Sequence, residues 1–122
     1  MPDSVSSDFW DDIQKLVESS KIEIDRPKGS AHPAYPDTIY PFDYGYLAGT
    51  NSPDGGGIDV FIGSGNRSEV SGVICTVDML QRNVELKVLL GCSAEEMNAI
   101  FHFLDTDSMG CMLLQHNGQR AG

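Results

Sequence analysis

Acidic side chains and flexible glycines meet in one short stretch of the chain, residues 54–62. Asp54 precedes three consecutive glycines, and Asp59 stands inside the apolar run 58–62. Burying a carboxylate in such a run is costly unless something positive pairs with it, so Asp59 predicts a metal ion or a lysine nearby. For Asp54 a simpler interpretation stays open, because aspartate beside glycine is a common turn former.

Two pairs of oppositely charged residues alternate with apolar side chains elsewhere in the chain. Lys21 and Glu23 form the first pair, and Glu85 and Lys87 form the second. Alternation with a period of two places both members of a pair on one face of a strand. Each of these predicted strands therefore presents a carboxylate and an ammonium group to the same side.

Together these residues have the chemistry of a site for a metal and an oxyanion. If Asp54, Asp59 and Glu85 converge, they offer the hard oxygen ligands that Mg²⁺ prefers. Lys21 and Lys87 can hold phosphoryl oxygens beside such a metal. The sequence thus predicts Mg²⁺-assisted chemistry on a phosphoryl compound.

The overall charge excludes some partners and favours a metal. Of 122 residues, 18 are acidic and 8 are basic, which gives a formal net charge of -10. Such a chain repels nucleic-acid backbones and anionic membrane surfaces, so we expect neither nucleic acid nor a membrane as a partner. An anionic substrate would need a divalent cation to offset the clustered carboxylates.

The cysteines and the N-terminal residues indicate a cytoplasmic protein. Cys75, Cys92 and Cys111 are odd in number and widely spaced among apolar residues, which is typical of reduced core thiols. The sequence has neither the pattern of a secretory signal nor the roughly 18 apolar residues of a membrane span. We therefore expect a soluble cytoplasmic protein.

Hydrophobic periodicity predicts two helices and about five strands. The first helix is expected over residues 8–19 with Ser7 as its N-terminal cap. The second follows the capping-box pair Ser93 and Glu96 and ends near residue 104. Residues 40–46 have the composition of an aromatic-rich turn. The expected strands are 21–25, 58–62, 70–80, 84–90 and 111–114.

The order of these elements indicates the fold class. Because strands are grouped in sequence rather than alternating with helices, we predict an α+β fold around a small, mostly antiparallel barrel. The length suits one domain over residues 1–122. Its ends, 1–6 and 117–122, are expected to be disordered.

At these residues the sequence resembles the soluble Mg²⁺-dependent inorganic pyrophosphatases (family I). The resemblance follows the family's order over about residues 21–90, somewhat more than half of the chain. It implies a five-stranded barrel of the oligonucleotide-binding (OB) type with two helices, assembled into a homo-oligomer. The matching pieces are Lys21-Ile22-Glu23-Ile24-Asp25, Tyr40-Pro41-x-x-Tyr44-Gly45-Tyr46, Asp54-Gly-x-x-x-Asp59-Val60 and Glu85-x-Lys87.

The resemblance also implies a role for each matching residue. In that family, metal ions activate a water that attacks one phosphorus of pyrophosphate, giving two phosphates. The implied metal is Mg²⁺, with Mn²⁺ or Co²⁺ as replacements, and its implied ligands are Asp54, Asp59, Glu85 and Glu23. The residues implied in catalysis are Asp59, Lys21, Lys87 and Tyr44, of which Lys21, Lys87 and Tyr44 also bind substrate.

Several departures from the family pattern, among them the absence of its C-terminal Tyr-Lys pair from the second helix, leave two hypotheses open. The family signature is Asp-x-Asp-x-x-Asp, and the middle acid, which orients or deprotonates the attacking water, is Gly56 here. The family's arginine between the first strand and the tyrosine turn has no clear counterpart, and His32 stands near that position. The chain is accordingly either a divergent inorganic pyrophosphatase that acts on pyrophosphate or a related phosphoanhydride, or a catalytically impaired relative that binds a metal, an anion or a protein partner.

Overall fold

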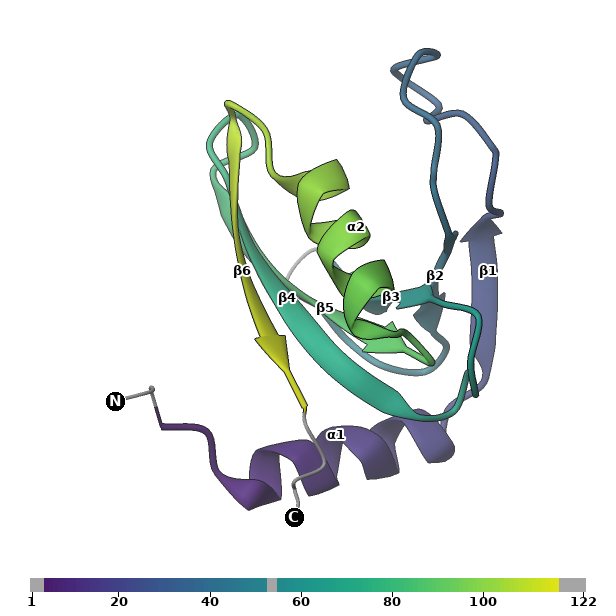
Figure 1. The fold of residues 1–122 in the computed structure, drawn as a ribbon, viewed down its shortest axis with the longest axis vertical. Helices are drawn as coiled ribbons and strands as arrows, with labels where there is room; N and C mark the ends of the chain where they lie inside the picture. The colour runs from purple at the N-terminus through teal and green to yellow at the C-terminus, as the bar shows by residue number, and fades with distance from the viewer. Residues whose placement is uncertain (1–3, 53–54, 117–122) are drawn as a thin grey trace.

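One mixed β-sheet with a helix on each face makes up the described part of this computed structural model (Figure 1). The structure describes residues 4–52 and 55–116. The elements follow in chain order as α1 (Ser7–Glu18), β1 (Ile22–Arg26), β2 (Asp43–Leu47), β3 (Ile58–Ile62), β4 (Val70–Asp78), β5 (Asn83–Leu90), α2 (Ala94–Leu104) and β6 (Met109–Gln115).

The sheet consists of two antiparallel halves that meet at one parallel pair. Its strand order is β1-β2-β3-β5-β4-β6. Pairing is antiparallel within β1-β2-β3 and within β5-β4-β6. The parallel pair of β3 and β5, called the seam below, joins the two halves. The sheet formed by the described residues is open, with β1 and β6 at its edges, so the prediction of a barrel is corrected, because these two strands do not pair with each other.

The predicted α+β class is confirmed, and so are the two helices. The predicted elements are present with bounds that shift by at most two residues. The described residues form six strands rather than the predicted five, because the residues expected to form an aromatic turn contain β2. Predicting only a turn there was wrong, since Tyr44 and Tyr46 pair with residues of both neighbouring strands.

Both helices begin at serine caps, as their sequences predict. In α1 the cap is Ser6 rather than Ser7, and its side chain accepts a hydrogen bond from Phe9 N. In α2 the predicted capping box of Ser93 and Glu96 is complete. Neither helix in the described ranges has the length and apolar character needed to cross a bilayer. Residues 1–3 and 117–122, part of the ends where disorder was expected, lie outside the described residues.

Two hydrophobic layers cover the two faces of the sheet. The α1 layer packs the helix residues Ile13 and Val17 against alternate strand residues such as Val60 and Val88. The α2 layer packs Met97 and Ile100 against the intervening ones, including Phe61, Ile74 and Leu89. Strand alternation thus sorts the side chains, and the charged residues at 59, 85 and 87 fall on the α2 face.

Gly45 marks a close approach of β1 and β2 and provides a test of this packing. A Cβ at this position would overlap the carbonyl oxygen of Glu23 on β1. We expect Gly45→Ala to lower the free energy of unfolding by about 3 kcal/mol or more, because two paired backbones would have to separate. Urea denaturation measures this. The matched control is Gly110→Ala on β6, where an added Cβ meets nothing within 4 Å. Equal losses for the two variants would contradict the packing described.

Candidate functional site

Lys87 on β5 is the centre of a charged cluster at the seam. Its Nζ donates hydrogen bonds to Asp59 Oδ2 at 2.9 Å, to Glu85 Oε1 at 3.0 Å and to Tyr44 OH at 3.2 Å. Lys87 is only 5% exposed, so its ammonium group depends on these partners rather than on water. The four residues are called the Lys87 cluster below. The expectation that Asp59 needs a cation beside it is met by this lysine.

The strand register brings the cluster together. Asp59 lies directly opposite Lys87 in the parallel seam. Glu85 precedes Lys87 by two residues and therefore shares its face. On the other side, Tyr46 of β2 lies opposite Asp59, which places Tyr44 on this face as well. Three strands thus supply the four side chains.

Burial and charge set the protonation states in the Lys87 cluster. Burial alone would lower the pKa of Lys87, but the negative charge that Tyr44 carries when ionised and the carboxylates of Asp59 and Glu85 outweigh it and raise this pKa. Burial raises the pKa of Tyr44 well above its ordinary value, although Lys87 opposes the shift. At neutral pH the lysine is therefore charged and the phenol neutral. Two carboxylates facing one ammonium leave an excess of one negative charge, which favours a further cation.

Lys21 and Glu23 lie on the same face but at the edge of the sheet. Glu23 on β1 is opposite Tyr46, which in turn is opposite Asp59. Two strand spacings of roughly 4.8 Å separate Glu23 from Asp59. Lys21 Nζ forms an ion pair with Glu23 Oε2 at 3.3 Å, and both side chains are substantially exposed. Lys21 and Glu23 thus lie in line with the Lys87 cluster, but their ion pair is with each other.

Three of the four predicted metal ligands, Glu23, Asp59 and Glu85, belong to the described residues. Asp54 lies outside the described residues. Among the described residues, no three His, Cys, Asp or Glu side chains gather as they would around a metal. Asp59 and Glu85 do converge, and together with Ser52 they border a small cavity of about 200 Å³. Two carboxylates are a donor set that suits Mg²⁺, which is commonly held by one or two carboxylates plus substrate phosphates.

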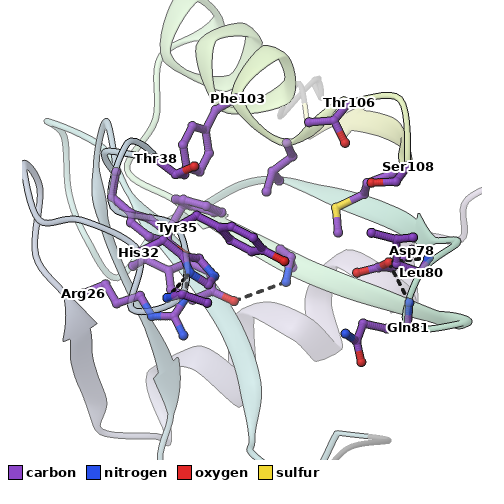
Figure 2. A pocket seen from close by; sticks show the side chains of 17 residues that line it. Arg26, His32, Tyr35, Thr38, Asp78, Leu80, Gln81, Phe103, Thr106 and Ser108 are labelled. Carbon is purple, nitrogen blue, oxygen red and sulfur yellow. Dashed lines mark hydrogen bonds between the residues drawn. The ribbon is translucent and has the colours of Figure 1, made fainter.

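A larger cavity of about 630 Å³ is lined in part by Lys87 and Tyr44. Figure 2 shows Arg26 and His32 on one side of it and Asp78 and Gln81 on the opposite side. The loop between β1 and β2, the end of α2 and the β4–β5 turn form its walls. The cavity thus has two cationic groups at its base, Arg26 and Lys87.

Arg26 is a candidate that sequence reasoning missed. Strict alternation along β1 would put it on the α1 face with Ile24. The register shifts between Ile24 and Arg26, so that Arg26 lies opposite Tyr44 and joins the cavity face. Its guanidinium donates a hydrogen bond to Tyr40 OH and lies 5.7 Å from the centre of the Tyr44 ring. Bulges leave little trace in a sequence, although an arginine directly before Pro27 does mark the end of a strand.

The fold resembles those of solved inorganic pyrophosphatases. The inorganic pyrophosphatase of Helicobacter pylori matches with a TM-score of 0.53 and 16% identity, over 77% of this chain and 81% of that one. An inorganic pyrophosphatase of Coxiella burnetii (TM-score 0.49, 14% identity, 77% and 82% covered) and an inorganic phosphatase of Anaplasma phagocytophilum (0.49, 16%, 77% and 80%) match less well. No protein-family model and no curated sequence matches the chain. The likeness shows a pyrophosphatase-like α+β fold with OB-like character, as the sequence predicted.

Proposed function

We propose that this chain is a divergent member of the soluble Mg²⁺-dependent inorganic pyrophosphatases (family I) and hydrolyses pyrophosphate to two phosphates. The observation that carries the proposal is the Lys87 cluster, in which three strands of a pyrophosphatase-like fold bring two carboxylates and a phenol to one buried ammonium group. The resemblance to the family implies a role in the same reaction for each of these four residues.

The proposed metal ligands are Asp59 and Glu85, with Asp54 and Glu23 as further carboxylates from the sequence pattern. The excess negative charge of the Lys87 cluster supports binding of a divalent cation there. Mg²⁺, or Mn²⁺ or Co²⁺ in its place, would neutralise phosphoryl oxygens and lower the pKa of a bound water.

The basic and phenolic residues would hold the substrate. Lys87 stays charged and can donate to a phosphoryl oxygen when its carboxylate partners turn to a metal. Tyr44 stays a phenol and can donate its proton in a hydrogen bond. Arg26, at the base of the same cavity, can take up the charge of the leaving phosphate. Lys21 would reach phosphoryl oxygens from the edge strand.

The chemical step is a direct displacement at phosphorus. The water oxygen forms a bond to one phosphorus, and the bridging P–O bond breaks with its electron pair going to the leaving phosphate. Gly56 supplies no carboxylate, so we propose that Asp59 or Glu85 receives the proton of the attacking water. No covalent intermediate with the protein is required.

A second candidate function is binding without turnover of a metal, an anion or a protein partner. It is favoured by Gly56 and by the way in which Lys87 is already neutralised by two carboxylates. A single experiment separates the two functions. Phosphate release from pyrophosphate is measured with Mg²⁺, Mn²⁺, Co²⁺ and EDTA. Metal-dependent turnover supports the pyrophosphatase, and no release with any metal supports the binding protein.

We also propose a homo-oligomer. Several exposed apolar side chains lie beyond α1 on the α1 face of the sheet, among them Val77 and Val84, which are opposite each other, and Met112 on the neighbouring strand. Exposed apolar groups gathered in this way commonly form subunit contacts.

The oligomer prediction can be checked by sedimentation velocity. We expect the wild-type species to be at least twice the 13.3 kDa chain mass. Val84→Glu should shift it towards the monomer, because Val84 is 61% exposed and a carboxylate there would have to be buried between subunits. Ile39→Glu, at an exposed site on the β1–β2 loop, is the matched control. A monomeric wild type would contradict the proposal.

A further inference from the structure

The large cavity beside Lys87 is bigger than pyrophosphate requires. Its volume is about 630 Å³. A water molecule takes up about 30 Å³ in the liquid, so the few heavy atoms of pyrophosphate would fill well under half of this space. Cavities of 300–1,000 Å³ generally hold ligands the size of a nucleotide or a drug. The remaining volume is therefore large enough for a second chemical group on the ligand.

The walls of the spare volume are aromatic. His32 and Tyr40 have nearly parallel rings with centroids 6.2 Å apart, and Tyr35 lies 5.0 Å from His32. Phe103 of α2 closes the wall, with its ring 5.2 Å from Tyr40. Tyr35 is 61% exposed, so most of its ring is accessible to a ligand. Aromatic faces of this kind stack on nucleobases with little dependence on the base.

The loop that carries this wall is held in place by its own hydrogen bonds. Ala34 N donates to His32 Nδ1 at 3.0 Å, which fixes the orientation of the ring. His32 N donates to Thr38 O at 2.8 Å, and Thr38 N donates to Tyr35 O at 2.9 Å. A stacking surface fixed in this way loses little conformational entropy when a ligand binds.

Polar groups occupy the two ends of the cavity. Arg26 and Lys87 stand at one end, close to the Tyr44 ring. Gln81 lies at the opposite side, next to Asp78 (Figure 2). A ligand with an anionic end, a flat aromatic body and hydrogen-bonding edges would satisfy all three regions. Nucleoside polyphosphates have this combination.

We propose that the cavity binds nucleoside polyphosphates, with the phosphates at Arg26 and Lys87 and the base stacked on His32 and Tyr35. This rests on the proposed function in so far as the bound compound is hydrolysed. The step is then the same displacement, in which water attacks the terminal phosphorus, the P–O bond to the remaining nucleotide breaks, and phosphate is released. Binding itself does not depend on hydrolysis.

The test compares two ligands that differ by the nucleoside. Binding of ATP and of inorganic tripolyphosphate is measured by titration calorimetry at low salt in buffer with Ca²⁺, which offsets the carboxylates and, as a weaker Lewis acid than Mg²⁺, slows turnover. We expect the wild-type chain to bind ATP at least about tenfold more tightly than tripolyphosphate, the preference that one stacked base typically provides. Tyr35→Ala should lower the affinity for ATP about tenfold and leave the affinity for tripolyphosphate within about twofold of the wild-type value. Ile39→Ala, on the same loop but outside the cavity, should leave both unchanged.

The outcomes separate this inference from the proposed function. Equal affinity of the wild-type chain for the two ligands would overturn the inference, even if pyrophosphate is hydrolysed. An equal loss of affinity for both ligands in Tyr35→Ala would also overturn it, because Tyr35 would then support the fold or contact the phosphates rather than the base. A preference for ATP that depends on Tyr35 supports the inference, and it would do so even if no phosphoanhydride is hydrolysed and the pyrophosphatase proposal fails.

Discussion

Lys87→Met is expected to lower the free energy of unfolding by about 2–3 kcal/mol. The substitution leaves Asp59 and Glu85 facing each other without a cation, and removing one partner of a buried ion pair typically costs about 3–5 kcal/mol. The expected value is smaller here because the side chains of Asp59 and Glu85 keep 24% and 20% of their exposure and are partly screened by water. Urea denaturation gives the value.

Two controls make this result specific. Lys21→Met removes an exposed lysine with one carboxylate partner and should change stability by less than about 0.5 kcal/mol. Millimolar Mg²⁺ should raise the melting temperature of Lys87→Met more than that of the wild type, because the two carboxylates are then available to a divalent cation. A Lys87→Met chain as stable as the wild type would show that the ammonium group does not hold the cluster together. An equal response of both proteins to Mg²⁺ would argue against a metal at Asp59 and Glu85.

Asp59→Asn should reduce the rate of phosphate release from pyrophosphate by about 100-fold or more. The amide keeps an oxygen that can accept a hydrogen bond from Lys87 Nζ, so the fold should persist. It loses the negative charge that a metal would need, and losses of this size are typical when an electrostatic group of an active site is removed. Steady-state kinetics with saturating Mg²⁺ measure the change.

Comparison with a surface variant distinguishes a loss of catalysis from a nonspecific effect of substituting a carboxylate. Glu95→Gln removes an exposed carboxylate from the first turn of α2 and should leave the rate unchanged. Wild-type rates in Asp59→Asn would remove Asp59 from the mechanism. If instead the wild type itself releases no phosphate, the kinetics favour the binding function, and the Mg²⁺ response of Lys87→Met still reports on the metal site.

The alternation of charged and apolar residues correctly predicted which side chains share a face of a strand. It predicted that Glu85 and Lys87 share one face of their strand, and the structure places both on the α2 face. The apolar run around Asp59 predicted a positive neighbour, and Lys87 is that neighbour. These features could be predicted because each depends on local periodicity or on the free energy of burying one charge.

Other parts of the site depended on contacts that a local pattern does not contain. Gly45 looked like a turn residue, but it is a strand residue whose missing side chain lets β1 and β2 approach. The bulge before Arg26 turns that side chain to the cavity, and it follows from pairing with β2 rather than from β1 alone. The depth at which Lys87 is buried likewise depends on the parallel seam, which joins strands from different halves of the sheet.

The seam also has a consequence for the order in which the molecule folds. Within each half, hairpins such as β4–β5 join neighbouring segments, whereas Lys87 reaches Asp59 across 28 residues and Tyr44 across 43. Closing a longer loop costs more conformational entropy, and contacts between residues far apart in the sequence slow folding. We therefore expect hairpins such as β4–β5 to form first and the seam to form later, so that a partly folded chain can contain hairpins from both halves of the sheet and still have no assembled site.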